Sequence, residues 1–470
     1  MVRFRAVSLF SGAGGLDWGF KEAGFDIVFA NDVLGHMTKT YSLNFGLKHV
    51  TCSRQPCVAE RGVVLQASVE HVDFSGLAGE DVDVLVGGPP CQDFSIVRGP
   101  SRSGIEVRRG RLYAHFVRAL ITLQPKAFVF ENVPGLVSTD NGLAYNVILE
   151  DLRNLKTRWR EVRAVINTGN NSHNIQGYEI ISSDFVEMTR LGLPQMRKRL
   201  IIIGVRKDLI PETSTDFLQS GLYGLYLKLN KKLMGEEDVL AKYPLTPIET
   251  FEGDILPNLQ GIYEDVMKEY EGVWEEVKTP RALKWKREVW DKLTFDIVKD
   301  YIFMNGIRVA SEEELEQAFR RHREVLEELG YYRRSVKNLI FPDGSNSRPN
   351  EQPSVVERLK RIPPGENHEF VRGTKWEVKG LMSNIYRRAH PLMPAPTVIA
   401  YGGGGTWGYH YEGGRGMLSN RERARLQSFP DTFLFTGTWS QVRAQIGEAV
   451  PPLVAKRIAQ AVIHLLKTLE

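Results

Sequence analysis

Residues 5–23 read RAVSLFSGAGGLDWGFKEA, and this stretch decides the fold. Its apolar residues 5–10 predict a strand, and the apolar spacing of residues 15–23 predicts a helix. The glycines between them let the backbone approach a ligand closely, and Phe10 adds an aromatic face. The turn has neither the GxGxxG of dinucleotide enzymes nor the lysine of a P-loop. It therefore favours an adenosine-type cofactor without phosphates, although a merely structural turn is the alternative.

The alternation of strands and helices continues along the first 205 residues. Strands are predicted at residues 27–30, 82–86 and 127–130, and helices at 112–123 and 142–155. This rhythm predicts an α/β fold with a doubly wound, mostly parallel sheet, which binds its ligands at the carboxyl ends of the strands. At the end of the second strand, Asp32 is placed to accept hydrogen bonds from ribose hydroxyls, and Asn31 is expected to support the turn.

The segment Gly87-Gly-Pro-Pro-Cys-Gln-Asp-Phe-Ser95 follows the predicted strand 82–86. Its two prolines stiffen the chain and present the thiol of Cys91 at the carboxyl end of a strand, as a nucleophile would be presented. The next strand ends in Glu131 and Asn132, which places a carboxyl group near that thiol. The alternatives are an inert buried cysteine and a salt-bridged or helix-capping Glu131.

The net charge of +4 and the pI near 8.7 favour a nucleic-acid partner only weakly. The local charge is more informative, because a glycine- and serine-rich stretch carries six arginines and the single acid Glu106. We expect a loop that contacts phosphates, with a solvated basic loop as the alternative. The six are Arg98, Arg102, Arg108, Arg109, Arg111 and Arg118.

Cys52, Cys57 and Cys91 are too few, and odd in number, for a disulfide framework, and Cys52/Cys57 lacks the second ligand pair that zinc needs. These features predict a reducing compartment and no metal. The sequence has no signal-peptide pattern and no run of 18 apolar residues. We therefore expect a cytoplasmic protein, nucleoid-associated when bound to DNA, with no membrane partner.

From about Arg206 the pattern changes to longer charged segments, such as the helix-like residues 312–329. We predict a first catalytic part at residues 1–205, an inserted domain at 206–395 and a returning catalytic part at 396–470. In the returning part, Ser419 and Glu422 form a predicted capping box, and Pro451-Pro452 open a final helix that ends near Leu469.

Six motifs occur in a recognisable order. They are Phe10-Ser-Gly-Ala-Gly-Gly, Pro89-Pro-Cys-Gln, Glu131-Asn-Val, Gln195-Met-Arg-Lys-Arg199, Arg423-Ala-Arg-Leu-Gln-Ser-Phe-Pro430 and Gln445-Ile-Gly447. Together they resemble the DNA cytosine-5 methyltransferases of prokaryotic restriction-modification systems, over about residues 1–205 and 384–470. The resemblance implies a Rossmann-like, S-adenosylmethionine-dependent fold whose inserted smaller domain recognises the DNA target.

The resemblance also implies the chemistry. A thiolate at Cys91 would add to carbon 6 of cytosine while Glu131 holds or protonates ring nitrogen 3, so that carbon 5 takes the methyl group. Arg199 would contact the cytosine, with Asn132, Gln195 and Arg197 supporting the site. The implied contacts to S-adenosylmethionine are Phe10, Ser11, Gly12, Ala13, Gly14, Gly15, Leu16, Asp32, Val33 and Pro89. Glu448 and Ser68 depart from the family pattern, which has asparagine and an acid there.

The implied substrate is double-stranded DNA with the target base flipped out of the duplex. The implied DNA contacts are Gln92, Ser95, Arg109, Arg111 and Thr397. The inserted domain adds basic clusters that are compatible with DNA contact or with a solvated face: Lys284, Lys286, Arg287, Arg320, Arg321, Arg323, Arg333 and Arg334. We further expect a monomer, with a cognate restriction endonuclease acting separately.

Three other functions are weighed against this one. A tRNA cytosine-5 methyltransferase would share the motifs, and Ser95 with the large inserted domain favours DNA. A catalytically silent DNA-binding module is disfavoured because Cys91, Glu131 and Arg199 occur together. A nicotinamide dehydrogenase is opposed by the absence of GxGxxG.

Overall fold

The computed structural model describes residues 3–90, 111–166, 174–210, 231, 235, 238–378, 385–401 and 408–469. The chain forms two compact units. The first comprises residues 1–187, 198–236 and 454–470, and the second comprises residues 188–197 and 237–453. These units differ from the predicted domains, because residues 396–453 belong with the middle of the chain and residues 188–197 join them.

The first unit is built on an eight-stranded sheet of order β3-β5-β2-β1-β7-β8-β10-β9. The strands are β1 Arg5–Leu9, β2 Asp26–Asp32, β3 Lys48–Thr51, β5 Val63–Gln66, β7 Val84–Gly87, β8 Ala127–Asn132, β9 Tyr178–Glu187 and β10 Lys198–Arg206. All neighbours from β3 to β8 pair in parallel, whereas β10 is antiparallel to both β8 and β9. The predicted α/β fold with a mostly parallel sheet is confirmed.

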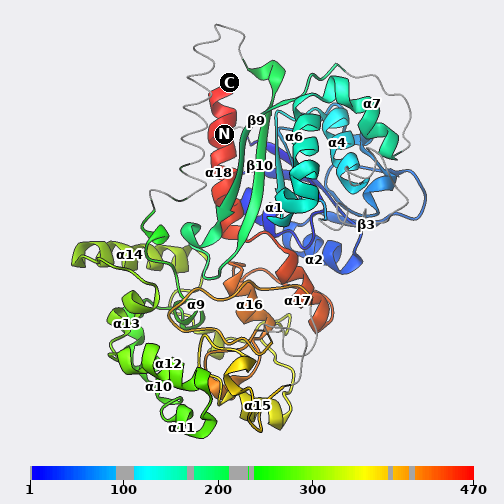
Figure 1. Ribbon diagram of the computed structural model, residues 1–470. Coiled ribbons are helices and arrows are strands. Elements are labelled where there is room, and N and C mark those ends of the chain that lie inside the picture. Colours follow the sequence, from blue (N-terminus) through cyan, green and yellow to red (C-terminus); the bar gives the residue numbers. More distant parts are fainter. Residues whose placement is uncertain are drawn as a thin grey trace. The chain divides into compact units, whose positions relative to one another are not determined.

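Helices cover both faces of this sheet (Figure 1). Apolar residues of α4, α6 and α7 form one buried cluster with the strands, in which Phe116 of α4 contacts Phe128 and Phe130 of β8 edge-on. In Figure 1, α18 lies on the other side of the sheet from these helices. Among the described residues of this unit, the helices are α1 Gly15–Ala23, α2 Gly35–Phe45, α4 Arg111–Leu123, α5 Gly135–Ser138, α6 Leu143–Arg153, α7 Leu155–Ile166 and most of α18 Pro452–Leu469.

The final helix packs against α1. A Cβ placed on Gly19 would lie 2.4 Å from the Ala455 side chain, so only glycine allows this approach. The stretch Trp439–Leu469 is long and apolar enough to cross a bilayer by length and composition alone, but 67% of its most apolar window is buried inside the protein. Such burial is usual for a core helix.

A disulfide joins Cys52 to Cys57, with the two Cα atoms 5.8 Å apart. The argument from cysteine number did not anticipate this bond, because two cysteines close in sequence can pair without any larger framework. The bond lies between β3 and the two-residue strand β4, Cys57–Val58, which pairs with β6, Val72–Asp73.

The second unit is mainly helical and has cores of its own, one of which gathers Trp285, Phe370 and Tyr386. Its helices are α9 Pro247–Glu252, α10 Gln260–Lys268, α11 Val273–Val277, α12 Pro280–Glu288, α13 Ile297–Met304, α14 Glu312–Glu328, α15 Pro353–Leu359, α16 Asn420–Leu426 and α17 Trp439–Glu448. The predicted capping box at α16 is confirmed, with Ser419 and Glu422 each accepting a backbone N–H of the other.

Candidate active site and cofactor edge

Five parallel strands of the first unit, β1, β2, β5, β7 and β8, end at one edge of the sheet, which we call the carboxyl edge. The predicted site residues Phe10, Asp32, Pro89 and Glu131 lie at or just beyond these strand ends. β10 runs antiparallel to β8, so it begins at the same edge, with Ile201 opposite Glu131. The topology therefore gathers residues that lie far apart in the sequence.

The glycine-rich turn after β1 has an unusual backbone. Phe10 adopts a left-handed φ of 55°, a conformation that non-glycine residues rarely adopt and that is concentrated at functional sites. The backbone N–H of Ser11 donates to the carbonyl of Asn31 at 3.0 Å, and that of Gly12 donates to Asp32 Oδ2 at 2.9 Å. The turn is thus tied directly to the end of β2.

Asp32 has a second backbone donor, since the N–H of Leu34 binds its Oδ1 at 2.9 Å. Burial raises the pKa of Asp32, and the two backbone hydrogen bonds oppose that rise. A carboxylate offers about four lone-pair positions, so it can accept further hydrogen bonds from ribose hydroxyls. Its neighbour Val33 is 57% exposed and presents an apolar surface at the same edge. This pairing of an acceptor with an apolar surface fits a ribose with its adjoining base.

The side chain of Asn31 joins the end of β2 to the chain that follows β5. Its side-chain amide donates to the carbonyls of Leu65 and Ala67, at 3.0 and 2.9 Å. These bonds hold the chain as it leaves β5, immediately before Ser68.

Glu131 and Arg199 form an ion pair, with Arg199 Nε 3.1 Å from Glu131 Oε1 and both side chains mostly buried, at 17% and 14% exposure. A second guanidinium nitrogen, Nη1, donates to the carbonyl of Lys198 at 2.8 Å. Because a guanidinium carries five N–H donors, donors remain for an oxygen of a ligand. Glu131 is therefore salt-bridged, which was the alternative to a catalytic role, but its partner is Arg199, the residue that was predicted to share its site.

The chain that leads to Cys91 passes directly against Glu131. A Cβ on Gly88 would lie 2.8 Å from Glu131 Oε2 and 3.0 Å from the Glu131 backbone oxygen, so a larger residue here would displace the Glu131 carboxyl group. Asn132 then holds the next residue, with its side-chain amide donating to the carbonyl of Pro89 at 2.9 Å. Gly88 was not among the predicted site residues, and its only sequence signal was its place before Pro89-Pro90. Cys91 itself, with Gln92, Ser95 and Arg109, lies outside the described residues.

Gln195, Arg197 and Thr397 belong to the second unit. The amide of Gln195 donates to the carbonyl of Leu426 at 2.8 Å and accepts the N–H of Val398 at 2.8 Å. Arg197 donates to the carbonyls of Gly447 and Ala449 at 3.1 and 3.0 Å, and Thr397 donates to the carbonyl of Met196. Gln195 and Arg197 therefore connect their own motif with two others, those that contain Leu426 and Gly447.

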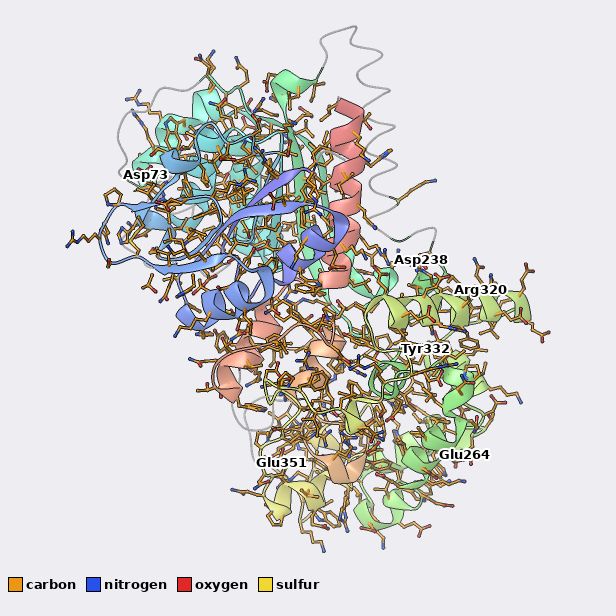
Figure 2. All side chains as sticks on the ribbon, turned by 180° about the vertical axis from the view of Figure 1, so that it is seen from behind. Asp73, Asp238, Glu264, Arg320, Tyr332 and Glu351 are labelled. Atoms are coloured by element: carbon orange, nitrogen blue, oxygen red, sulfur yellow. A yellow bond between two sulfur atoms is a disulfide. The ribbon has the colours of Figure 1, made fainter. Side chains whose placement is uncertain are left out.

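Most of the basic residues predicted to contact DNA have acidic partners. In the first unit, Arg111 lies 3.6 Å from Glu70 and its side chain is 65% exposed. In the inserted segment, five of the eight cluster residues form ion pairs: Lys284, Lys286, Arg321, Arg323 and Arg334. Arg320, labelled on α14 in Figure 2, is exposed. This pairing is typical of a solvated charged surface.

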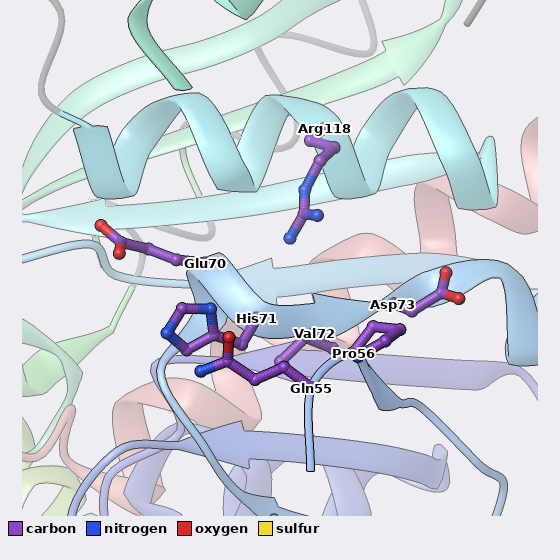
Figure 3. Close-up of a pocket in the computed structure, with 7 residues that line it drawn as sticks. All are labelled: Gln55, Pro56, Glu70, His71, Val72, Asp73 and Arg118. Atoms are coloured by element: carbon purple, nitrogen blue, oxygen red, sulfur yellow. The ribbon is translucent and has the colours of Figure 1, made fainter. Parts of the chain in front are cut away.

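A surface pocket of about 450 Å³ lies elsewhere on the first unit, between α4 and the disulfide-bonded loop (Figure 3). Arg118 of α4 points into it and donates to the carbonyl of Val69 at 2.8 Å. None of the predicted cofactor or catalytic residues lines it. The lining consists of Gln55, Pro56, Glu70, His71, Val72, Asp73 and Arg118.

Comparisons with known proteins agree with the arrangement at the carboxyl edge. Residues 4–464 match the model of the C-5 cytosine-specific DNA methylase family. The DNA (cytosine-5-)-methyltransferase M.ApeKI of Aeropyrum pernix is 55% identical over 99% of this chain and 99% of its own length. The type II methyltransferase M.NgoFVII of Neisseria gonorrhoeae is 30% identical over 98% of this chain and 87% of its own.

A solved structure shares the fold. It is a crystal structure from E. coli described as a DNA modification methyltransferase encoded within a prophage, with a TM-score of 0.55, 22% identity and 99% of each chain covered.

Proposed function

We propose that this chain, which belongs to the C-5 cytosine-specific DNA methylase family and is a DNA cytosine-5 methyltransferase, uses Cys91 as its nucleophile and Glu131 with Arg199 to hold the cytosine. The observation that carries the proposal is the buried Glu131–Arg199 ion pair, against which the chain passes just before Cys91. The structure of Cys91 is not described, so its role rests on the motif and on this neighbourhood.

The reaction needs a covalent step because carbon 5 of cytosine is a poor nucleophile. The Cys91 thiolate forms a bond to carbon 6, and the displaced electron pair makes carbon 5 nucleophilic. Glu131 holds the proton on ring nitrogen 3 that balances this charge, and Arg199 keeps the carboxyl group in position. Carbon 5 would then take the methyl group as the bond between that group and the cofactor sulfur breaks, with its electron pair left on the sulfur of S-adenosylhomocysteine. Carbon 5 would lose its proton to a base, and the returning electron pair would expel the thiolate.

The cofactor site that we propose comprises the glycine-rich turn, Asp32 and Val33. Asp32 would accept the ribose hydroxyls and Val33 would contact the adenine, while Phe10 and the backbone of residues 11–16 surround the rest. When bound, S-adenosylmethionine supplies a methyl group on a positively charged sulfur. A Cβ on Gly12 would meet no atom within 4 Å, so the turn leaves open space for such a ligand.

The test is methyl transfer from labelled S-adenosylmethionine to duplex DNA, with the product located by bisulfite sequencing. Wild type is expected to label one recurrent cytosine context, and Cys91→Ala is expected to label none. Cys52→Ser is the matched control, because it also replaces a cysteine, one that belongs to the disulfide and not to the proposed site, and it should retain activity. Full activity in Cys91→Ala would refute the assigned nucleophile.

A tRNA substrate is not favoured, because the curated relatives that span the chain are DNA methyltransferases by name. Labelled tRNA in the same assay provides the direct check. We also propose that the inserted segment selects the DNA sequence, that the enzyme acts as a cytoplasmic monomer, and that a separate restriction endonuclease shares its target. Sedimentation of the enzyme with and without DNA tests the monomer.

A further inference from the structure

A buried carboxyl group that the mechanism does not use lies next to the cofactor turn. Asp17, in the first turn of α1, is 0% exposed. Ser8 of β1 and Tyr41 of α2 are its polar neighbours, and both are buried as well. The side-chain oxygens of all three residues make no regular hydrogen bond within the described chain. Burying an acid in this way is costly, because its charged form loses water and gains no regular hydrogen bond in return.

These three residues lie before, after and against the glycine-rich turn. Ser8 stands two residues before Phe10, where the turn begins, and Asp17 stands two residues after Gly15, where it ends. Tyr41 belongs to the helix on which the turn packs. The single carboxyl group of Asp17 therefore faces both the strand that enters the turn and the helix beneath it.

The side chains beneath the turn are closely packed. A Cβ on Gly14 would lie 2.5 Å from the Phe45 ring and 3.0 Å from that of Tyr41. Tyr41 is stacked on Phe45 with ring centroids 4.1 Å apart, and Trp18 contacts Phe45 edge-on. If the Tyr41 ring moved, the backbone of the turn at Gly14 would therefore have to move with it.

We propose that Asp17 is a positioning residue for the cofactor: buried beside Ser8 and Tyr41, its carboxyl group holds the glycine-rich turn in the conformation that binds S-adenosylmethionine. The inference rests on the proposed cofactor site. Asp17 acts through the turn and does not touch the reacting atoms. Its ionised form can accept from both hydroxyls, whereas the protonated form must donate to one of them.

The ionisation of this group falls in an accessible range of pH. Burial raises the pKa of Asp17 to about 6, while Ser8 and Tyr41 act in the opposite direction. Burial, and then the charge of Asp17, hold the pKa of Tyr41 well above its usual value, so Tyr41 stays a donor. The elements packed against α1 carry other titratable groups: His36 and Lys39 of α2, Asp26 and Asp32 of β2, and Lys456, Arg457, His464 and Lys467 of α18. No cation among the described residues pairs with Asp17.

The experiment measures the affinity of the full-length enzyme for S-adenosylhomocysteine by calorimetry without DNA, between about pH 5 and about pH 8. Asp17→Ala is expected to weaken binding about tenfold at pH 7.5, with kcat at saturating S-adenosylmethionine unchanged. Tyr41→Phe, which keeps the ring stacking, should weaken binding less. Glu22→Gln, an exposed acid on the same helix, is the matched control and should bind as wild type does.

The pH profile separates positioning from general destabilisation. Asp32 also titrates at this edge, so the informative quantity is the difference in affinity between wild type and Asp17→Asn. This difference should change near pH 6, with wild type gaining affinity as the pH rises. Wild-type affinity and pH profile in Asp17→Asn and Tyr41→Phe would overturn the proposal, even if Asp17→Ala fails to fold. Failure of wild type to bind would instead refute the cofactor site.

Discussion

At the scale of single residues, the site depends on polar groups that are buried but paired across the sheet. Glu131 and Arg199 were predicted from separate motifs, and the pairing of β8 with β10 brings them to 3.1 Å. Their motifs could be recognised in the sequence, whereas their contact could not, because it depends on the antiparallel register. Asp17 shows the opposite case: it looks like an ordinary first-turn acid, and only the fold reveals that it is buried.

Removing the Arg199 guanidinium should impair catalysis more than cofactor binding. Arg199→Ala leaves Glu131 without its partner and removes donors aimed at the base, so we expect single-turnover methylation to fall by about 100-fold. Arg199→Lys should recover part of that loss, because it restores the charge without the planar geometry. The side chain of Lys198 pairs with the exposed Glu187, so Lys198→Ala should leave the methylation rate nearly unchanged. Unchanged turnover in Arg199→Ala would exclude Arg199 from the site.

The buried Asp17 should also make stability depend on pH. Since folding raises its pKa from 3.8 to about 6, the folded state holds the proton more tightly than the unfolded state. The stabilisation of the folded state by this proton is therefore fully present below pH 3.8 and is lost as the pH rises through about 6. Relative to Asp17→Asn, wild type should lose about 3 kcal/mol of unfolding free energy across this range. Urea denaturation of both proteins at several pH values measures the difference, and parallel curves would contradict it.

At the scale of elements, turns and helix ends were predicted well, because their signals are local. α1 occupies the predicted residues 15–23, and the α16 capping box forms as expected. The short strands β3 to β6 were not predicted, because strands of two to four residues carry too few positions for a periodicity to show. The disulfide between β3 and β4 was missed along with them.

The glycine-rich turn supplies a matched test of close packing. Gly14 and Gly46 both have a left-handed φ, of 97° and 72°, but a Cβ would meet Phe45 only at Gly14 and nothing within 4 Å at Gly46. Gly46→Ala should lower the unfolding free energy by about 1–2 kcal/mol through backbone strain alone. Gly14→Ala should lose about 1–3 kcal/mol more and weaken binding of S-adenosylhomocysteine. Thermal denaturation and calorimetry measure both effects, and equal losses would argue against the packing constraint.

At the scale of the whole molecule, the boundaries of the two compact units differ from those that the motifs predicted. The motif around Arg425 was expected to return to the catalytic part of the chain. Instead, its buried guanidinium pairs with Asp431 at 2.6 Å and donates to the carbonyls of Thr250 and Arg334 at 3.0 and 2.9 Å. The second unit therefore needs both the inserted segment and residues 396–453.

Exchanges of sequence with the Neisseria gonorrhoeae relative should reveal this division. A chimera that exchanges residues 206–395 separates Arg425 from Thr250 and Arg334, and breaking such a buried network costs about 3–5 kcal/mol. It should unfold at a lower temperature than a chimera that exchanges residues 188–197 and 237–453 together. Thermal denaturation compares the two, and bisulfite sequencing shows whether the methylated context changes. Equal stability would show that the shorter segment folds independently.

The sequence by itself determined the α/β class, the glycine-rich turn, the candidate nucleophile Cys91 and the family, because these depend on local periodicity and on motifs read in order. Only the tertiary structure decided that Arg199 pairs with Glu131, that the chain at Gly88 passes against Glu131 and that residues 396–453 pack with the inserted segment. The physical reason is that strand register, burial and close approach arise between residues distant in the chain, and a single sequence carries no record of such distances.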